Sequence, residues 1–205
     1  MADSLFNRRG LLQEYLSITY GVLCLSERYD SLLMWAHYAS DHKGFVVEFD
    51  VSHAWFNQGT ANPGEVGVGV VRKITYSDER PTISLQSNPI DNYFAKGAEW
   101  SYEGEWRLVL RLDKATKTLS TPTSHVQLFE VPHTAISSII LGARISVADR
   151  KMLMQCRELP AFAHVRLVQA SLSPRRYGLE FSPIPKQQAC TTGEGTHKSR
   201  KRRPR

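Results

Sequence analysis

The sequence predicts an α+β fold, a single domain built on one mixed or antiparallel sheet with two or three helices. Six or seven short segments are apolar throughout or alternate between apolar and polar residues, as strands do. Two longer segments begin with good capping residues, as helices do. The length of 205 residues and the 41% hydrophobic content suit one domain with a sizeable core.

The N-terminal elements follow from local signals. Leu5–Leu16 is a short helical candidate, weakened by Gly10. Tyr20–Ser26 reads YGVLCLS, apolar on both faces, which predicts a buried central strand. Asp30 or Ser31 can cap a helix through SLLMWAHYASDH that stops at Gly44, and the alternation in Gly44–Asp50 predicts the next strand.

The middle of the chain reads as strands separated by loops. Val66–Tyr76 alternates cleanly and predicts one long strand, between loops at 57–65 and 77–89 that are rich in Gly, Pro and Asn. Asp91–Lys96 is expected to form a helical turn. Glu105–Leu112 is predicted to be a strand, and Asp113–Ser124 a loop.

The C-terminal third predicts a β-α-β unit followed by one more strand. Ser146 and Asp149 form a capping box for a helix at Val147–Glu158, which Pro160 stops. The strands are expected at Ser137–Leu141, His164–Leu172 and Tyr177–Phe181.

Charge divides the chain into a balanced body and a basic tail. Of the 26 Lys and Arg and 20 Asp and Glu residues, residues 186–205 hold seven and one, which leaves 19 of each in residues 1–185. We therefore expect a helical lead-in at 1–19, an α+β domain at 20–183 and a disordered basic tail at 184–205. Such a tail is usually a solvated terminus, and weak nucleic-acid attraction through residues 198–205 is the alternative.

The remaining composition excludes several classes of protein. No stretch is long and apolar enough for a membrane helix and no signal peptide is evident, so we expect a cytoplasmic protein without a membrane partner. The three cysteines lack a disulfide or metal-binding spacing, and no metal motif or nucleotide-binding glycine loop occurs, so no metal is expected.

The most chemically suggestive stretch is WSYEGEWRLVL at Trp100–Leu110. If it is extended, Glu103, Glu105 and Arg107 share one face, opposite Trp106 and the leucines that face the core. The two acids are then expected at the rim of the sheet, unburied. Adjacent carboxylates can take different roles, and a fixed negative charge stabilises an oxocarbenium ion as it forms.

A purely structural explanation remains open for the E-x-E-x-R segment and for the segment that contains Trp35, Tyr38 and His42. A face with the pattern E-x-E-x-R is also typical of a cross-strand salt-bridge ladder, and the motif alone slightly favours that reading. Trp35, Tyr38 and His42 share a helix face, where packing on the sheet is a more common role than catalysis.

Five blocks of sequence together resemble a bacterial family of unknown function, DUF2971. They are VLCLSE (22–27), LMWAHYASDHKGFVVEFD (33–50), VRKITYSD (71–78), FAKGAEWSYEGEWRLV (94–109) and SSIILGA (137–143), so that the resemblance runs from about Tyr20 to Phe181. The family is similar to the AbiGi-type abortive-infection proteins. The resemblance therefore implies a role in phage defence, with a cognate toxin or antitoxin as partner.

A second, looser resemblance concerns the E-x-E element, which is similar to that of ADP-ribosyltransferases. It implies a transferase-like fold and NAD as substrate, with Glu105 as the catalytic carboxylate and Glu103 orienting a protein or nucleic-acid acceptor. The implied NAD-binding residues are Ser26, Trp35, Tyr38 and Arg107. The chain departs from that pattern because it offers only Arg8, Arg9 and Tyr15 before the first strand, where such enzymes carry an Arg or His that grips NAD.

Three hypotheses follow. The first is that the protein is an NAD-consuming transferase or hydrolase. The second is that it is a non-catalytic, antitoxin-like binding partner. A nucleic-acid-binding protein that acts through its tail is the third, and the neutral body counts against it.

Overall fold

The structure is a computed structural model, and it describes residues 10–11, 14–59, 62, 65–80, 88–121 and 125–186. Residues 187–205 of the predicted basic tail and most of the first predicted helix lie outside these residues, although residues 14–19 are helical. Ile184, at the start of the predicted tail, instead belongs to β11. The strands are β1 (Tyr20–Ser26), β2 (Phe45–Phe49), β3 (Arg72–Lys73), β4 (Thr75–Ser77), β5 (Ala95–Gly97), β6 (Glu105–Arg111), β7 (Lys117–Ser120), β8 (His125–Leu128), β9 (Ile136–Leu141), β10 (Arg166–Leu172) and β11 (Leu179–Ile184). The α-helices are α2 (Leu32–Tyr38) and α3 (Val147–Glu158), and the 3-10 helices are η1 (Ala54–Phe56), η3 (Pro89–Phe94), η4 (Ala98–Glu103), η5 (Leu112–Lys114), η6 (His133–Ala135) and η7 (Pro160–Phe162).

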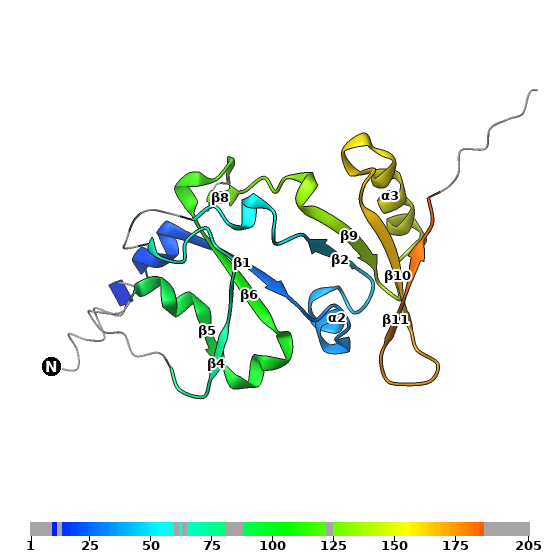
Figure 1. The fold of residues 1–205 in the computed structure, drawn as a ribbon, viewed down its shortest axis with the longest axis horizontal. Coiled ribbons are helices and arrows are strands. Elements are labelled where there is room, and N and C mark those ends of the chain that lie inside the picture. The colour runs from blue at the N-terminus through cyan, green and yellow to red at the C-terminus, as the bar shows by residue number, and fades with distance from the viewer. Residues whose placement is uncertain are drawn as a thin grey trace, which may run out of the picture.

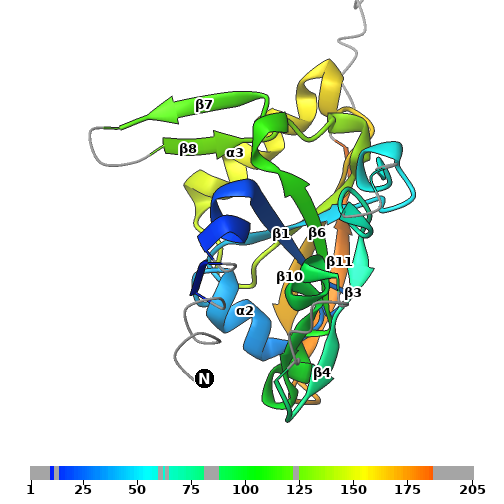
Figure 2. The same ribbon diagram turned by 90° about the vertical axis from the view of Figure 1, so that its left-hand side faces the viewer.

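The fold is α+β, as predicted, but the strands divide between two principal sheets. A four-stranded sheet has the order β11-β10-β9-β2 (Figure 1), and a three-stranded sheet has the order β1-β6-β3 (Figure 2). Two further pairs of strands, β4-β5 and β7-β8, stand apart from them. A single sheet was expected because sequence periodicity locates strands but carries no information on which strands pair.

Both faces of β6 are buried, each in a different core. Leu108 and Leu110 pack with residues of β1 and with Phe49 of β2, which joins the two principal sheets. Val109, on the opposite face, packs with Ile74 and Phe94 and with residues from the N-terminal segment. The neighbouring strand β1 is an edge strand rather than the central strand predicted, because it pairs with β6 alone among the described residues.

Helix α2 packs on the four-stranded sheet through Trp35 and Ala39. Ser31 caps it as predicted, accepting a hydrogen bond from the Met34 amide. The helix ends at Tyr38, four residues before the predicted end. The reason is a run of positive φ angles, 49°, 57° and 64° at residues 40–42, which turns the chain back so that the ring of His42 stacks on Trp35.

The predicted β-α-β unit is confirmed. Strands β9 and β10 are parallel, and α3 lies between them in sequence with the bounds that the capping box predicted. The helix packs through Leu153 against Leu141 and Leu167, on the face of the four-stranded sheet opposite α2 (Figure 1).

The predicted long strand Val66–Tyr76 is wrong. Gly67 and Gly69 have φ angles of +94° and +73°, which an extended strand does not contain, and they break the segment into turns and isolated bridges. The remainder forms β3 and β4, which belong to different sheets. The helical turn predicted at Asp91–Lys96 is confirmed for residues 91–94, which belong to the 3-10 helix η3, whereas residues 95–96 begin β5.

A second error concerns Asp113–Ser124, which was predicted to be a loop. It contains η5 and β7, and β7 pairs with β8 as an antiparallel ribbon that projects from the body (Figure 2). The ribbon is exposed along most of its length, so its residues lack the alternating burial pattern by which a strand is recognised. None of the helices in the described part of the chain has the length and apolar content that a membrane-spanning segment needs.

Candidate active site

A cleft of about 1000 Å³ lies where β1, the edge of β2, α2 and the beginning of β6 meet. Its size is that of a pocket for a small-molecule ligand or cofactor. All six residues that the sequence singled out line this cleft: Glu103, Glu105, Arg107, Ser26, Trp35 and Tyr38. The apolar part of its wall comes mostly from Leu23, Leu25, Val46, Val47, Phe49, Ile140, Val168 and Phe181.

The two glutamates are placed by a tight turn at Gly104. Glu103 ends η4 and Glu105 begins β6, while Gly104 between them has a φ of +53°. A side chain at Gly104 would also collide with Glu27 and Arg28. Glu103 is therefore not extended, which was the condition under which the two acids were expected to share a strand face. The turn still directs both carboxylates toward Lys96.

Lys96 joins the two acids. Its Nζ donates hydrogen bonds to Glu103 Oε2 at 2.5 Å and to Glu105 Oε2 at 2.9 Å. Burial opposes the charged form of the lysine, but the two carboxylates outweigh it and raise the pKa of Lys96. The ammonium also lies 5.0 Å from the ring centroid of Trp100. A single cation thus neutralises part of the repulsion between two neighbouring carboxylates.

Arg107 holds Glu105 with a two-pronged contact. Its Nε and Nη2 donate to Glu105 Oε1 and Oε2 at 2.7 and 3.1 Å. Burial would raise the pKa of Glu105, but hydrogen bonds from Arg107, Cys24 and Lys96 outweigh burial and lower it to about 2. Glu105 is therefore ionised throughout the physiological pH range.

The expectation that the acids lie unburied at the rim is wrong. Glu103 and Glu105 are only 3% and 4% exposed. Burial of a carboxylate depends on cations that pair with it. One of these cations, Lys96, comes from another strand, so the alternation within the strand of Glu105 could not predict the burial.

The other predicted site residues differ in how much they offer a ligand. The hydroxyl of Ser26 donates to the Glu103 carbonyl at 2.6 Å and accepts from the Arg28 amide. Tyr38 is 64% exposed, and its phenol donates to Glu103 Oε1 at 2.8 Å. Trp35 is 1% exposed and belongs to the core, where its indole donates to the Tyr29 carbonyl. Tyr38 thus presents its ring to the cleft, whereas the ring of Trp35 is almost completely covered by the core.

Three side chains in contact with Glu105 were not among the predicted site residues. Lys96 could have been noticed as a lone cation in the block FAKGAEWSYEGEW. The phenol of Tyr76 accepts a hydrogen bond from the Glu105 amide at 2.8 Å, for which the sequence offers no signal. Cys24, which was counted within the apolar run YGVLCLS, is exposed to the cleft, where local desolvation and then Glu105 raise its pKa to about 11.

A second polar group lies across the cleft, on the four-stranded sheet. Glu48 of β2, Ser138 of β9 and Arg166 of β10 are direct cross-strand neighbours. The Ser138 hydroxyl donates to Glu48 Oε2, which also lies 3.5 Å from Arg166 Nη2. Within the described residues, no three His, Cys, Asp or Glu side chains form a group that could hold a metal ion.

Fold and site together define a class: an α+β protein whose cleft is lined by two buried carboxylates and by a partly buried lysine and arginine that pair with them. Residues 34–108 match the model of the family described as Protein of unknown function (DUF2971), which confirms the predicted resemblance over this part of the chain. The matched residues run from α2 to β6 and include Lys96, Glu103 and Glu105. No curated protein and no solved structure matches the chain.

Proposed function

We propose that the protein is an NAD-consuming enzyme that breaks the bond between the nicotinamide nitrogen and C1′ of the ribose. The electron pair of that bond leaves with nicotinamide, and an oxygen of the acceptor or of water bonds to C1′ and releases its proton. The observation that carries the proposal is the convergence of Glu103, Glu105 and Tyr38 on one ligand-sized cleft.

Glu105 would stabilise the positive charge that develops on the sugar. Its low pKa keeps it ionised, and the arginine fork fixes its orientation before the substrate arrives. A charge that is already oriented and partly shielded from water costs little reorganisation at the moment of reaction. These features suit an electrostatic role, and they do not suit a proton donor.

Glu103 and Tyr38 would serve the other participants in the reaction. Tyr38 hydrogen-bonds to Glu103 and exposes its ring, which offers a flat surface against which nicotinamide can pack. Glu103, held by Tyr38 and Lys96, is the acid that would orient the acceptor hydroxyl.

Lys96 supports the proposal by showing where a positive charge is bound. Its ammonium lies between the two carboxylates at hydrogen-bonding distance from each. Because a lysine stem is flexible, the ammonium can move aside and leave part of this negative field to a cationic sugar.

The acceptor and the biological setting belong to the proposal as well. ADP-ribose would pass to a protein, a nucleic acid or water, and loss of NAD would halt an infected cell. This agrees with the phage-defence role that the similarity to AbiGi-type proteins implies.

A second candidate is a non-catalytic binding protein, and one observation favours it. Each of the four carboxylate oxygens of Glu103 and Glu105 already accepts a hydrogen bond from Tyr38, Lys96 or Arg107. Two cations therefore balance the two acids, and such a cluster can serve structure or partner binding alone.

The deciding experiment measures nicotinamide release from NAD by the wild type and by Glu105→Gln. We expect release by the wild type and a reduction of about 10²- to 10³-fold in the variant, which keeps the shape of the side chain and removes its charge. Glu158→Gln is the control, because Glu158 lies on α3 with its side chain 68% exposed, and it should behave as the wild type.

NAD binding followed by tryptophan fluorescence, together with the melting temperature, separates lost chemistry from lost folding. A wild type that binds NAD without releasing nicotinamide would identify a non-catalytic protein. A wild type that binds no NAD would reject both the enzyme and NAD as its ligand.

A further inference from the structure

The row formed by Glu48, Ser138 and Arg166 interrupts an otherwise apolar wall. The next row on the same face of the four-stranded sheet is Val46, Ile140 and Val168, and it follows the same cross-strand register. All six residues line the cleft. A polar row on an apolar wall marks a position where a ligand with polar groups gains hydrogen bonds.

Among the described residues, Glu48 is the carboxylate of the cleft that has one oxygen without a hydrogen-bond donor. Its Oε2 receives both the Ser138 hydroxyl and the more distant Arg166, whereas no hydrogen bond to Oε1 is found within the described part of the chain. Glu27, Glu103 and Glu105, by contrast, have both oxygens engaged. Ser138, which is 1% exposed, fixes the carboxylate so that the free oxygen has a defined direction.

We propose that Glu48 binds the vicinal hydroxyls of a ribose at the end of the ligand remote from Glu105. The inference rests on the proposed function, under which this sugar is the adenosine ribose of NAD. A carboxylate accepts hydrogen bonds from both hydroxyls of such a diol, and it repels the phosphate that replaces one hydroxyl in NADP. Glu48 therefore selects NAD over NADP.

Arg166 would reverse the preference between NAD and NADP if Glu48 were removed. Its side chain is 71% exposed and contacts Glu48 at 3.5 Å, a weak ion pair. When the carboxylate is removed, the guanidinium is left free to pair with a 2′-phosphate. Loss of Glu48 thus weakens the binding of NAD and favours the binding of NADP.

The test measures binding of NAD, NADP and nicotinamide mononucleotide, which lacks the adenosine half, to the wild type and to Glu48→Gln. We expect the variant to bind NAD about tenfold more weakly, because a hydrogen bond to a charged group is lost. Its affinity for NADP relative to NAD should rise at least as much, and its affinity for the mononucleotide should stay within about twofold.

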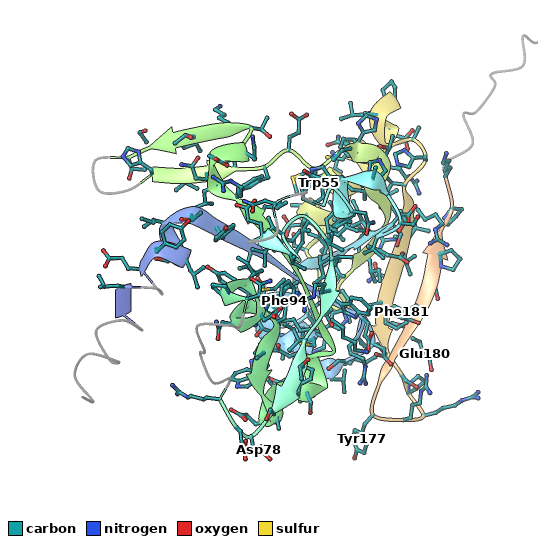
Figure 3. All side chains as sticks on the ribbon, turned by 60° about the vertical axis from the view of Figure 1, so that its left-hand side comes forward. Trp55, Asp78, Phe94, Tyr177, Glu180 and Phe181 are labelled. Carbon is teal, nitrogen blue, oxygen red and sulfur yellow. The ribbon has the colours of Figure 1, made fainter. Side chains whose placement is uncertain are left out.

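Glu180→Gln is a matched control. Glu180 also accepts a serine hydroxyl, from Ser173 at 2.6 Å, but it is exposed and does not line the cleft, unlike the adjacent Phe181 (Figure 3). Ser138→Ala is a second variant, which loosens Glu48 without removing its charge and should weaken NAD less than Glu48→Gln does.

The outcomes separate the inference from the function on which it rests. Binding of NAD that is unchanged in Glu48→Gln, or weakened equally with the mononucleotide, overturns the diol subsite and leaves the proposed function standing. A wild type that binds none of the three nucleotides overturns both.

Discussion

Glu105 makes the stability of the protein depend on pH at its acid limit. Hydrogen bonds in the folded state lower its pKa from 4.5 to about 2, whereas the unfolded chain keeps the ordinary value. The stabilisation is therefore fully present above about pH 5 and is lost as the pH falls toward 2, and it amounts to on the order of 3 kcal/mol at most.

We expect the free energy of unfolding, measured by urea denaturation at a series of pH values, to fall more steeply between pH 5 and 2 in the wild type than in Glu105→Gln. The glutamine cannot be protonated in this range and so contributes no slope. Glu158→Gln is the matched control, because the Glu158 side chain is 68% exposed. Equal slopes in Glu105→Gln and the wild type would show that Glu105 is not held ionised by its partners.

At the scale of elements, the end of β9 and the turn after α2 meet without room for a side chain. A Cβ on Gly142 would lie 2.2 Å from the carbonyl oxygen of His42 and 2.7 Å from that of Gly44. The Gly142 amide donates to Gly44, and the Arg144 amide donates to His42. This contact fixes the end of α2, the helix that carries Tyr38 to Glu103.

Gly142→Ala is therefore expected to destabilise the protein by about 2–4 kcal/mol, since backbone atoms must move to admit the methyl group. The measurement is thermal or urea denaturation. Gly178→Ala is the matched control, because its Cβ would meet nothing closer than 3.8 Å, and it should change stability by less than about 1 kcal/mol. Equal effects of the two substitutions would mean that the contact at Gly142 relaxes freely.

The elements that the sequence predicted well are those with signals inside their own segments. Helix α3 follows from its capping box, and β1 from its uninterrupted apolar run. The segment Val66–Tyr76 shows the limit, because its alternation suits a strand, while the conformations of Gly67 and Gly69 are set by the surrounding structure.

The same limit applies to the site. The pair Glu103 and Glu105 was visible as a motif, but its burial depends on Lys96, which comes from β5, and on a turn at Gly104. The polar row at Glu48 was invisible, because its three members come from strands that are distant in sequence and adjacent only in the sheet.

At the scale of the whole molecule, charge is divided between two parts with different expected partners. Residues 1–185 carry equal numbers of basic and acidic residues, so the body offers no net attraction for nucleic acid. Residues 198–205 contain six Lys or Arg and no acidic residue. Any binding to DNA or RNA is therefore expected to come from these eight residues alone.

We expect weak binding of the full chain to a double-stranded DNA fragment, with the logarithm of affinity falling linearly against the logarithm of salt concentration. The slope should be no steeper than about −5, because at most six basic side chains can release counterions. Removing residues 198–205, or replacing their six basic residues with serine at constant length, should abolish the binding and leave NAD affinity and melting temperature unchanged. Binding that survives both changes would place the contact on the neutral body, where attraction between net charge and phosphate cannot explain it. That result would favour a nucleic acid as the acceptor, bound near the cleft.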